Sequence, residues 1–386
     1  MRTTRDADVI ELVSQLVRVE SITPWLIPTG SGEAAVVTHM ARWLADVPVD
    51  VVVDELEPRR ANLVATLKGT GGGPTLCLNA HADTVGFDDW VDEALVPRVE
   101  GDRLYGLGAA DDKGCCAAAL LALEQLALQH VPLRGDLVVA CVADEEGASI
   151  GTERLLQRLH LDAAIVLEPD ALPRVVVEHQ GFGWIDIVVH GRSAHGSAPQ
   201  DGIDAIVVMG EIISRLHRWD IEHFCAAPDQ RNGRTVFHTG TIRGGTDYAT
   251  YPSTCTLGIE IGTQTGESLA DRVAEIETIF ADVRRCLPEA DAEVRVKLDR
   301  EPFLAAGHEP LLDCLDRSAR QHLGAELSRV GLNAWTDAAL MQAAGVPTVL
   351  LGPLGGNFHA PNEWVSISEV GNVCDLIVTA AADFLS

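Results

Sequence analysis

Residues 137–147 read L-V-V-A-C-V-A-D-E-E-G, an unbroken apolar run that ends in three consecutive acids. Such a run is typical of a strand that is buried on both faces, as in a parallel sheet between two layers of helices. The carboxyl ends of parallel strands meet at one edge of a sheet, where binding sites form. Because neighbouring carboxylates repel one another in a half-buried setting, we expect a cation among Asp144, Glu145 and Glu146.

Further apolar, strand-like runs occur on both sides of this strand in the sequence. Strand-like runs alternate with stretches whose apolar residues recur at helical spacing. The predicted strands are 49–53, 62–67, 75–80 and 163–167, and the predicted helices are 6–20, 34–45 and 114–129. This alternation predicts an α/β layer structure with a mostly parallel sheet covered on both faces.

The pattern changes near residue 180. Strands are predicted at 184–190, 235–242, 254–261 and 292–298, with helices at 203–219 and 267–286 between them. This β-α-β-β-α-β order is typical of a ferredoxin-like α+β unit. The α/β style returns in helix 309–323, strand 346–351 and helix 368–385. The sequence therefore predicts a catalytic domain made of residues 1–179 and 300–386, interrupted by an inserted lid at 180–299.

The composition excludes several classes of partner. The 386 residues carry 29 basic against 57 acidic side chains, a net charge of −28, which repels nucleic acid and anionic membranes. The first residues, M-R-T-T-R-D-A-D, lack the apolar stretch of a signal peptide, and no run of about 18 apolar residues occurs. Nine cysteines without a C-x-x-C pair indicate free thiols. We expect a cytoplasmic protein.

Acids and histidines follow the predicted strands at five places. These are His81-Ala82-Asp83, G-L-G-A-A-D-D-K-G (106–114), D-E-E-G (144–147), Glu168-Pro169 and G-P-L-G-G-N-F-H-A-P-N-E (352–363). Any one of them alone is typical of an ordinary strand end or turn. Together they bring imidazoles and carboxylates to one edge, a ligand set that suits zinc, with manganese or cobalt as alternatives.

In this order, the five motifs resemble those of the co-catalytic zinc amidohydrolases and exopeptidases that include acetylornithine deacetylase, succinyl-diaminopimelate desuccinylase, aminoacylase and carboxypeptidase G. The resemblance covers essentially the whole chain and implies two divalent metal ions. It assigns His81 and Glu168 to one metal, Glu146 and His359 to the other, and Asp111 to a bridge between them. It also implies that Asp83 orients the ring of His81, and that a cis peptide follows Asp111.

The resemblance gives separate roles to the neighbouring acids of D-E-E-G. Glu145 matches the general base, which takes a proton from the attacking water and later gives it to the leaving nitrogen. Glu146 binds metal. Asp144 receives no role.

The segment G-R-S-A-H-G-S-A-P (191–199) resembles the family's lid motif. Its histidine, His195, is implied to stabilise the oxyanion of the tetrahedral intermediate. In dimeric relatives this histidine comes from the partner subunit. The broad apolar face of the predicted helix 203–219 covers the lid sheet, and its remaining side could pair two lids in a homodimer.

The chain departs from the family where the lid usually binds substrate carboxylate. The patterns G-G-x-x-N-x-x-P and D-x-R place Ala249 and Gly262 where relatives have Asn and Arg. Arg243 or Arg192 could substitute, because a guanidinium binds carboxylate in a bidentate fork. Trp335, in N-A-W-T-D (333–337), either contacts the substrate or packs in the core.

Taken together, the sequence predicts a dinuclear metal-dependent hydrolase that cleaves the linear amide of an N-acyl amino acid. Two alternatives stay open: an exopeptidase that acts on dipeptides or an acyl-glutamate type of substrate, and a catalytically silent binding protein with the same fold. The sequence leaves the acyl group, the amino acid, the native metal and the oligomeric state undetermined.

Overall fold

The apolar runs of the sequence become neighbouring strands of one nine-stranded sheet in the computed structural model, which describes residues 4–87 and 90–386. Its four central strands run parallel in the order β6 (Asp136–Val142), β3 (Thr75–His81), β7 (Ala163–Leu167) and β15 (Thr348–Leu351). Nearly every residue of these strands is buried, which explains why their sequences are apolar without alternation. The predicted α/β class with a mostly parallel central sheet is confirmed.

Antiparallel strands extend this parallel centre on both sides. β2 (Arg60–Leu67) pairs with β6, and β1 (Asp50–Glu57) pairs with β2. On the other side, β8 (Arg174–His179) pairs with β15, and β13 (Phe303–Leu304) and β14 (Ser328–Leu332) pair with β8. The sequence analysis did not predict β8, β13 or β14.

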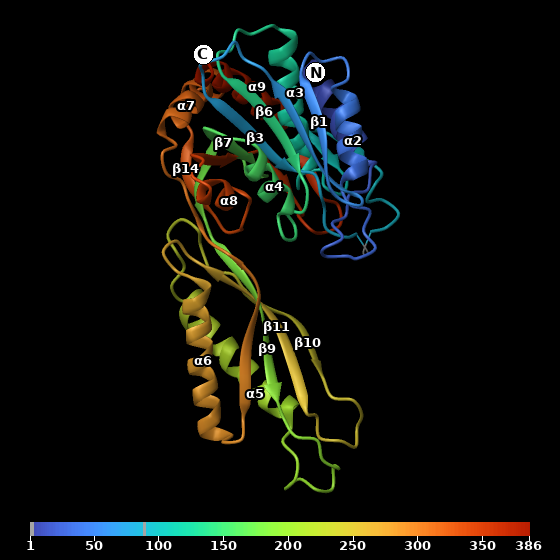
Figure 1. Ribbon diagram of the computed structural model, residues 1–386, viewed down its shortest axis with the longest axis vertical. Helices are drawn as coiled ribbons and strands as arrows, with labels where there is room; N and C mark the ends of the chain where they lie inside the picture. Colours follow the sequence, from blue (N-terminus) through green and yellow to red (C-terminus); the bar gives the residue numbers. More distant parts are fainter. Residues whose placement is uncertain (1–3, 88–89) are drawn as a thin grey trace. The chain divides into compact units, whose positions relative to one another are not determined.

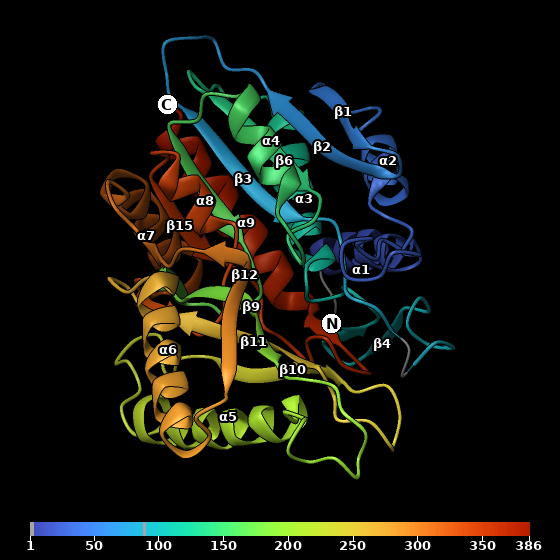
Figure 2. The ribbon, with the colours of Figure 1, turned by 60° about the horizontal axis from the view of Figure 1, so that its bottom comes forward.

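Helices cover both faces of the sheet (Figure 2). One layer consists of α1 (Thr4–Val17), α2 (Ala34–Trp43), α3 (Lys113–Leu128) and α9 (Ile367–Phe384), with α7 (Glu309–Leu323) packed on α9. The other layer is formed by two short helices, α4 (Ile150–Arg158) and α8 (Ala338–Ala343). α3 is buried almost all round because it lies between the sheet and helices α1 and α9.

A small antiparallel sheet brings two distant loops together. It contains β4 (Arg98–Glu100), β5 (Arg103–Tyr105), β16 (Gly355–Gly356) and β17 (Trp364–Ser366). Val365 of β17 pairs with Leu104 of β5, so the loop that carries His359 lies beside the segment that leads to Asp111. These strands of two or three residues are too short to leave a periodic pattern in the sequence.

The described chain divides into two compact units (Figure 1). Unit 1 runs up to Val177 and continues in Ala305–Arg329 and Thr336–Ser386, while unit 2 comprises Glu178–Leu304 and Val330–Trp335. That the ranges 1–179, 180–299 and 300–386 are separate domains stays a prediction. Among the helices of the described chain, none has both the length and the apolar character needed to cross a bilayer.

Unit 2 has the predicted β-α-β-β-α-β order. Its elements are β9 (Gly181–His190), α5 (Ala205–Asp220), the π-helical turn η1 (Ile221–Cys225), β10 (Phe237–Gly244), β11 (Thr254–Thr263), α6 (Leu269–Cys286) and β12 (Asp291–Arg300). The strands form an antiparallel sheet in the order β10-β11-β9-β12, and both helices pack on it through a separate apolar core. β10 is an edge strand with exposed side chains.

Candidate metal centre

The histidines and acids of the five strand-end motifs come together in unit 1. His81 is the last residue of β3, the D-E-E turn follows β6, and Glu168 follows β7. These three strands are parallel neighbours, so their carboxyl ends deliver the three groups to one edge of the sheet. Asp111 precedes α3, and His359 arrives through the small sheet.

The five predicted metal ligands form a chain of short contacts. His81 Nε2 lies 2.9 Å from Asp111 Oδ1, and His359 Nε2 lies 3.3 Å from Asp111 Oδ2. His359 Nε2 is also 2.9 Å from Glu146 Oε1, and His81 Nε2 is 3.9 Å from Glu168 Oε1. Asp111 therefore faces one imidazole with each of its two carboxylate oxygens.

The donor atoms fit divalent cations. One ligand atom each from His81, Asp111 and Glu146 lies within 4.8 Å of the others, and the same holds for His81, Asp112 and Glu168. Asp112 Oδ2 accepts a hydrogen bond from the His81 amide, whereas its buried Oδ1 has no partner among the described residues. Imidazole nitrogen and carboxylate oxygen suit zinc, cobalt or manganese, so the residues fit the predicted metals.

The pKa directions of these groups show how strongly the cluster attracts positive charge. Burial and then the charge of Glu168 raise the pKa of Glu145 well above its usual value, and burial and then Asp112 do the same for Glu168. Burial opposes protonation of His359, but its contacts with Asp111 and Glu146 outweigh this and raise its pKa to about 11. A divalent cation among these groups would favour the ionised form of the acids whose pKa burial raises.

Asp83 supports the site in two ways. Its main-chain oxygen accepts a 3.1 Å hydrogen bond from His81 Nδ1, while its carboxylate lies 3.5 Å from the same nitrogen. This contact places the proton on Nδ1 and leaves Nε2 free to bind metal. The carboxylate oxygens also accept from the amides of Glu145 and Glu146 at 3.1 Å. The resemblance implied the contact between Asp83 and the His81 ring. It did not indicate the hydrogen bonds from the amides of Glu145 and Glu146 to the Asp83 carboxylate.

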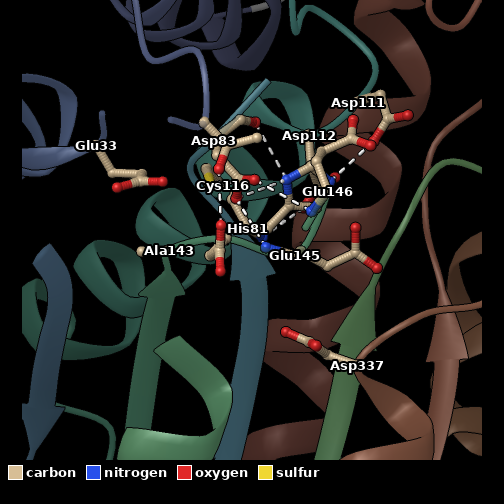
Figure 3. A network of polar contacts seen from close by, with 12 residues as sticks. Glu33, His81, Asp83, Asp111, Asp112, Cys116, Ala143, Glu145, Glu146 and Asp337 are labelled. Atoms are coloured by element: carbon tan, nitrogen blue, oxygen red, sulfur yellow. Dashed lines mark hydrogen bonds and ion pairs between the residues drawn. The ribbon is translucent and has the colours of Figure 1, made fainter. Parts of the chain in front are cut away.

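Further buried residues in this region were missed by the sequence analysis. The carboxylate of Glu363 accepts from the amides of Gly108, Ala110 and Asp111, each at 2.9 Å, and so holds the loop that carries Asp111. The peptide between Asp111 and Asp112 is cis, as the resemblance implied. Figure 3 shows Asp83, Asp112 and Glu146 close to His81, with Asp337 farther from the ring. In the sequence, Asp112 is visible only as the second acid of D-D-K-G, and Glu363 only as the last residue of H-A-P-N-E.

The residues predicted from the lid motif lie in unit 2. His195 is exposed, and its Nδ1 accepts a 3.2 Å hydrogen bond from the Ser197 amide. The ring proton is therefore on Nε2, which makes that nitrogen a donor. Arg192 Nε donates to the main-chain oxygen of Asp201 at 2.7 Å. Arg243 is exposed on β10 and lines a cavity of about 280 Å³ together with Ser193 and Tyr251.

Trp335 is engaged by packing within unit 2. Its ring lies edge-on to Phe182 with centroids 5.7 Å apart, and its Nε1 donates to the main-chain oxygen of Glu301 at 3.2 Å. Trp335 is half-buried and belongs to neither of the two apolar cores of the described chain. A contact with substrate stays a prediction.

Gly262 is closed to a side chain. A Cβ atom there would lie 2.7 Å from Gln180 Oε1, which itself accepts a hydrogen bond from the Val236 amide. Gln180 Nε2 donates in turn to the main-chain oxygens of Asn232 and Arg234. A side chain at this position would therefore have to displace the Gln180 amide from these hydrogen bonds.

Comparisons with known proteins agree on one family. The model of peptidase family M20/M25/M40 matches residues 77–383. The acetylornithine deacetylase of Aliivibrio fischeri (strain MJ11) is 28% identical over 376 residues, which is 92% of this chain and 93% of the relative. That of Proteus mirabilis (strain HI4320) is 29% identical over 372 residues, 94% of this chain and 92% of the relative.

Solved structures share the fold at lower identity. A tripeptidase from Staphylococcus aureus superposes with a TM-score of 0.80 at 23% identity and covers 98% of both chains. A dinuclear metal-binding peptidase of the M20 family from Bacillus subtilis has a TM-score of 0.74 at 16% identity and covers 99% of this chain and 98% of that one. At these identities the likeness establishes the fold.

Proposed function

The chain belongs to peptidase family M20/M25/M40 and is a hydrolase of that family; from this premise, we propose that it removes the acyl group from an N-acyl amino acid with the help of two divalent metal ions. The observation that carries the proposal is the cluster in which Asp111 faces both the buried His81 and the half-exposed His359, with Glu145 beside it. The similarity to acetylornithine deacetylases along more than nine-tenths of the chain favours a deacylase over an exopeptidase.

We assign the metals to five protein ligands. His81 and Glu168 would hold one ion, Glu146 and His359 the other, and Asp111 both; Asp112 is a further candidate on the side of Glu168. When bound, the ions would act as Lewis acids that polarise the scissile carbonyl and make water acidic enough to deprotonate near neutral pH. Zinc is the metal that we propose, with cobalt or manganese as alternatives.

Glu145 carries the proton transfers in this proposal. Its amide is held by Asp83, so the main chain at this residue is fixed while the carboxylate remains available. Burial raises its pKa, so the carboxylate accepts a proton from the attacking water more readily than an exposed glutamate does. The same proton then passes to the leaving nitrogen, which departs as a neutral amine. His195 of unit 2 would donate from Nε2 to the oxyanion of the tetrahedral intermediate, with unit 2 acting as a lid.

Arg243 is the proposed carboxylate clamp. The guanidinium of Arg192 is already used within unit 2, since it donates to Asp201 and lies 3.7 Å from Glu289. Arg243 is exposed, lines a cavity, and forms no ion pair with a described residue. A guanidinium without a partner binds a carboxylate in a bidentate fork without first breaking another contact.

A substrate panel tests the proposal. N-acetyl and N-succinyl amino acids should be cleaved with a kcat/KM about 10²-fold above that for dipeptides, because the positive metals next to the acyl group disfavour the ammonium of a dipeptide. Arg243→Ala should raise KM about 10- to 100-fold for substrates with a free carboxylate. Arg192→Ala is the matched control and should leave KM near the wild-type value. A preference for dipeptides would instead favour the exopeptidase.

A homodimer through unit 2 is also proposed. Apolar side chains are exposed on α5 and along the edge strand β10, among them Val207 at 59% and Ile242 at 56%. An unpaired edge strand next to an apolar helix face is a surface on which a second copy can extend the sheet. The mass of the particle in solution tests this, and a monomer that persists at high protein concentration would refute it. A cytoplasmic location likewise stays a prediction.

A further inference from the structure

A buried ion cluster lies directly behind the D-E-E turn. Arg60, at the start of β2, is only 5% exposed, and both of its acidic partners, Glu33 and Asp144, are completely buried. Arg60 Nε and Nη2 donate to the two carboxylate oxygens of Glu33 at 2.7 and 2.9 Å, and Nη2 also lies 2.6 Å from Asp144 Oδ1. Thr23 Oγ1 adds a 2.7 Å hydrogen bond to the same oxygen of Asp144.

Asp144 determines the shape of the turn. Its φ of 71° lies in the left-handed region, which aspartate tolerates better than most residues. Its Oδ2 accepts from the Ala148 amide at 3.1 Å, and its main-chain oxygen accepts from the amides of Gly147 and Ser149. The chain therefore folds back around Asp144, and the two residues between these contacts are Glu145 and Glu146.

The carboxylates of Asp83 and Asp144 thus bind different main-chain amides of the same turn. Asp83 accepts from the amides of Glu145 and Glu146, while Asp144 accepts from the amides that follow them. Asp83 is in turn close to His81, whereas Asp144 is anchored by Arg60. The position of the turn relative to the metal cluster consequently depends on the guanidinium.

The cluster is poorly explained by stability alone. One guanidinium faces two buried carboxylates, and buried ion pairs contribute little net stability compared with apolar residues of similar volume. An arrangement of this kind also adds negative charge next to a site that already contains several acids. Its benefit lies in geometry, because the planar fork of arginine fixes both carboxylates in one orientation.

We propose that Arg60 is a positioning residue for the reaction: through Asp144 it holds the turn that places the proposed base Glu145 and the proposed ligand Glu146. This inference rests on the function proposed above for Glu145. It also gives Asp144 the role that the sequence left unassigned. Glu33 and Thr23, from the segment between α1 and α2, complete the support.

Arg60→Lys tests the proposal, with Arg329→Lys as the matched control. Lysine keeps the charge but cannot reach both carboxylates with a fork. Arg329 forms an ion pair with the single carboxylate of Asp316 in unit 1 and is more exposed than Arg60, so it controls for the Arg-to-Lys change itself and not for burial. We expect Arg60→Lys to lower kcat about 10²-fold with KM near the wild-type value, since a misplacement of about 1 Å costs that much. Arg329→Lys should leave kcat unchanged.

Hydrogen exchange of the holoenzyme provides a second measurement that does not depend on turnover. In Arg60→Lys the amides of residues 145–149 should exchange faster than in the wild type, while the strands β3 and β7 keep their protection. Asp144→Asn should give the same local change and, combined with Arg60→Lys, little additional loss of kcat, because both changes break the same contact between Arg60 and Asp144.

The outcomes separate this inference from the proposed function. If Arg60→Lys retains wild-type kcat, or if exchange at 145–149 is unchanged, Arg60 has no positioning role. If the wild type cleaves no substrate of the panel, the proposed function fails, and exchange at 145–149 still decides whether Arg60 holds the turn. If Arg60→Lys does not fold, Asp144→Asn takes its place with the same two measurements.

Discussion

Replacing Glu145 with Gln is expected to lower kcat about 10²- to 10⁴-fold, the range over which a positioned general acid–base group contributes. Glutamine has nearly the same shape but cannot take a proton from water at neutral pH. The main-chain amide at this position still donates to Asp83, so the turn and the ligand Glu146 stay in place. KM and the metal content should therefore remain near their wild-type values, and steady-state kinetics with metal analysis checks both.

Glu153→Gln is the matched control for this experiment. Glu153 is exposed on α4, a few residues after the turn, and its replacement removes the same charge from the same region. The control should keep full activity. If Glu145→Gln also kept full activity, another group would have to take the proton, and Asp337, whose pKa burial raises to about 6, would be the next residue to replace.

Removal of the metal ions is the second change with a large expected effect. Turnover should fall to background after dialysis against a chelator and return when zinc, cobalt or manganese is added, because no side chain of the cluster replaces a Lewis acid. The ligands must lose protons to bind metal, and the pKa of His359 without metal is raised to about 11 by its contacts with Asp111 and Glu146. Metal affinity should consequently fall as the pH is lowered, which metal analysis after dialysis at different pH values checks.

The thermal midpoint gives an independent measure of the same event. A ligand present at about 1,000 times its dissociation constant stabilises the folded state by about 4 kcal/mol, so the metal-free protein should melt at a lower temperature. His359→Ala removes one proposed ligand and should reduce this metal-dependent shift. His322→Ala, which alters an exposed histidine on α7, should not. Full turnover in a preparation shown to contain no metal would contradict the dinuclear mechanism.

Local patterns were enough to place the main elements of the fold. The unbroken apolar runs at β3, β6 and β7 predicted buried parallel strands because both faces of these strands are covered by helices. Short elements were missed, among them α4, α8 and the small sheet that carries β16 and β17. A strand of two or three residues shows no period, and its position depends on its partner strand.

The site residues also divide into those that the sequence brings together and those that only tertiary contacts bring together. The sequence by itself determined that His81, Glu145 and Glu168 lie near one another, because each follows one of three parallel strands and such strands end at one edge. Only the tertiary structure decided that Gln180 closes the space at Gly262, that Glu363 holds the Asp111 loop, and that Arg60 anchors Asp144. The period of a strand encodes which side chains are buried, but the partner of a buried charge is set by contacts between residues far apart in the chain.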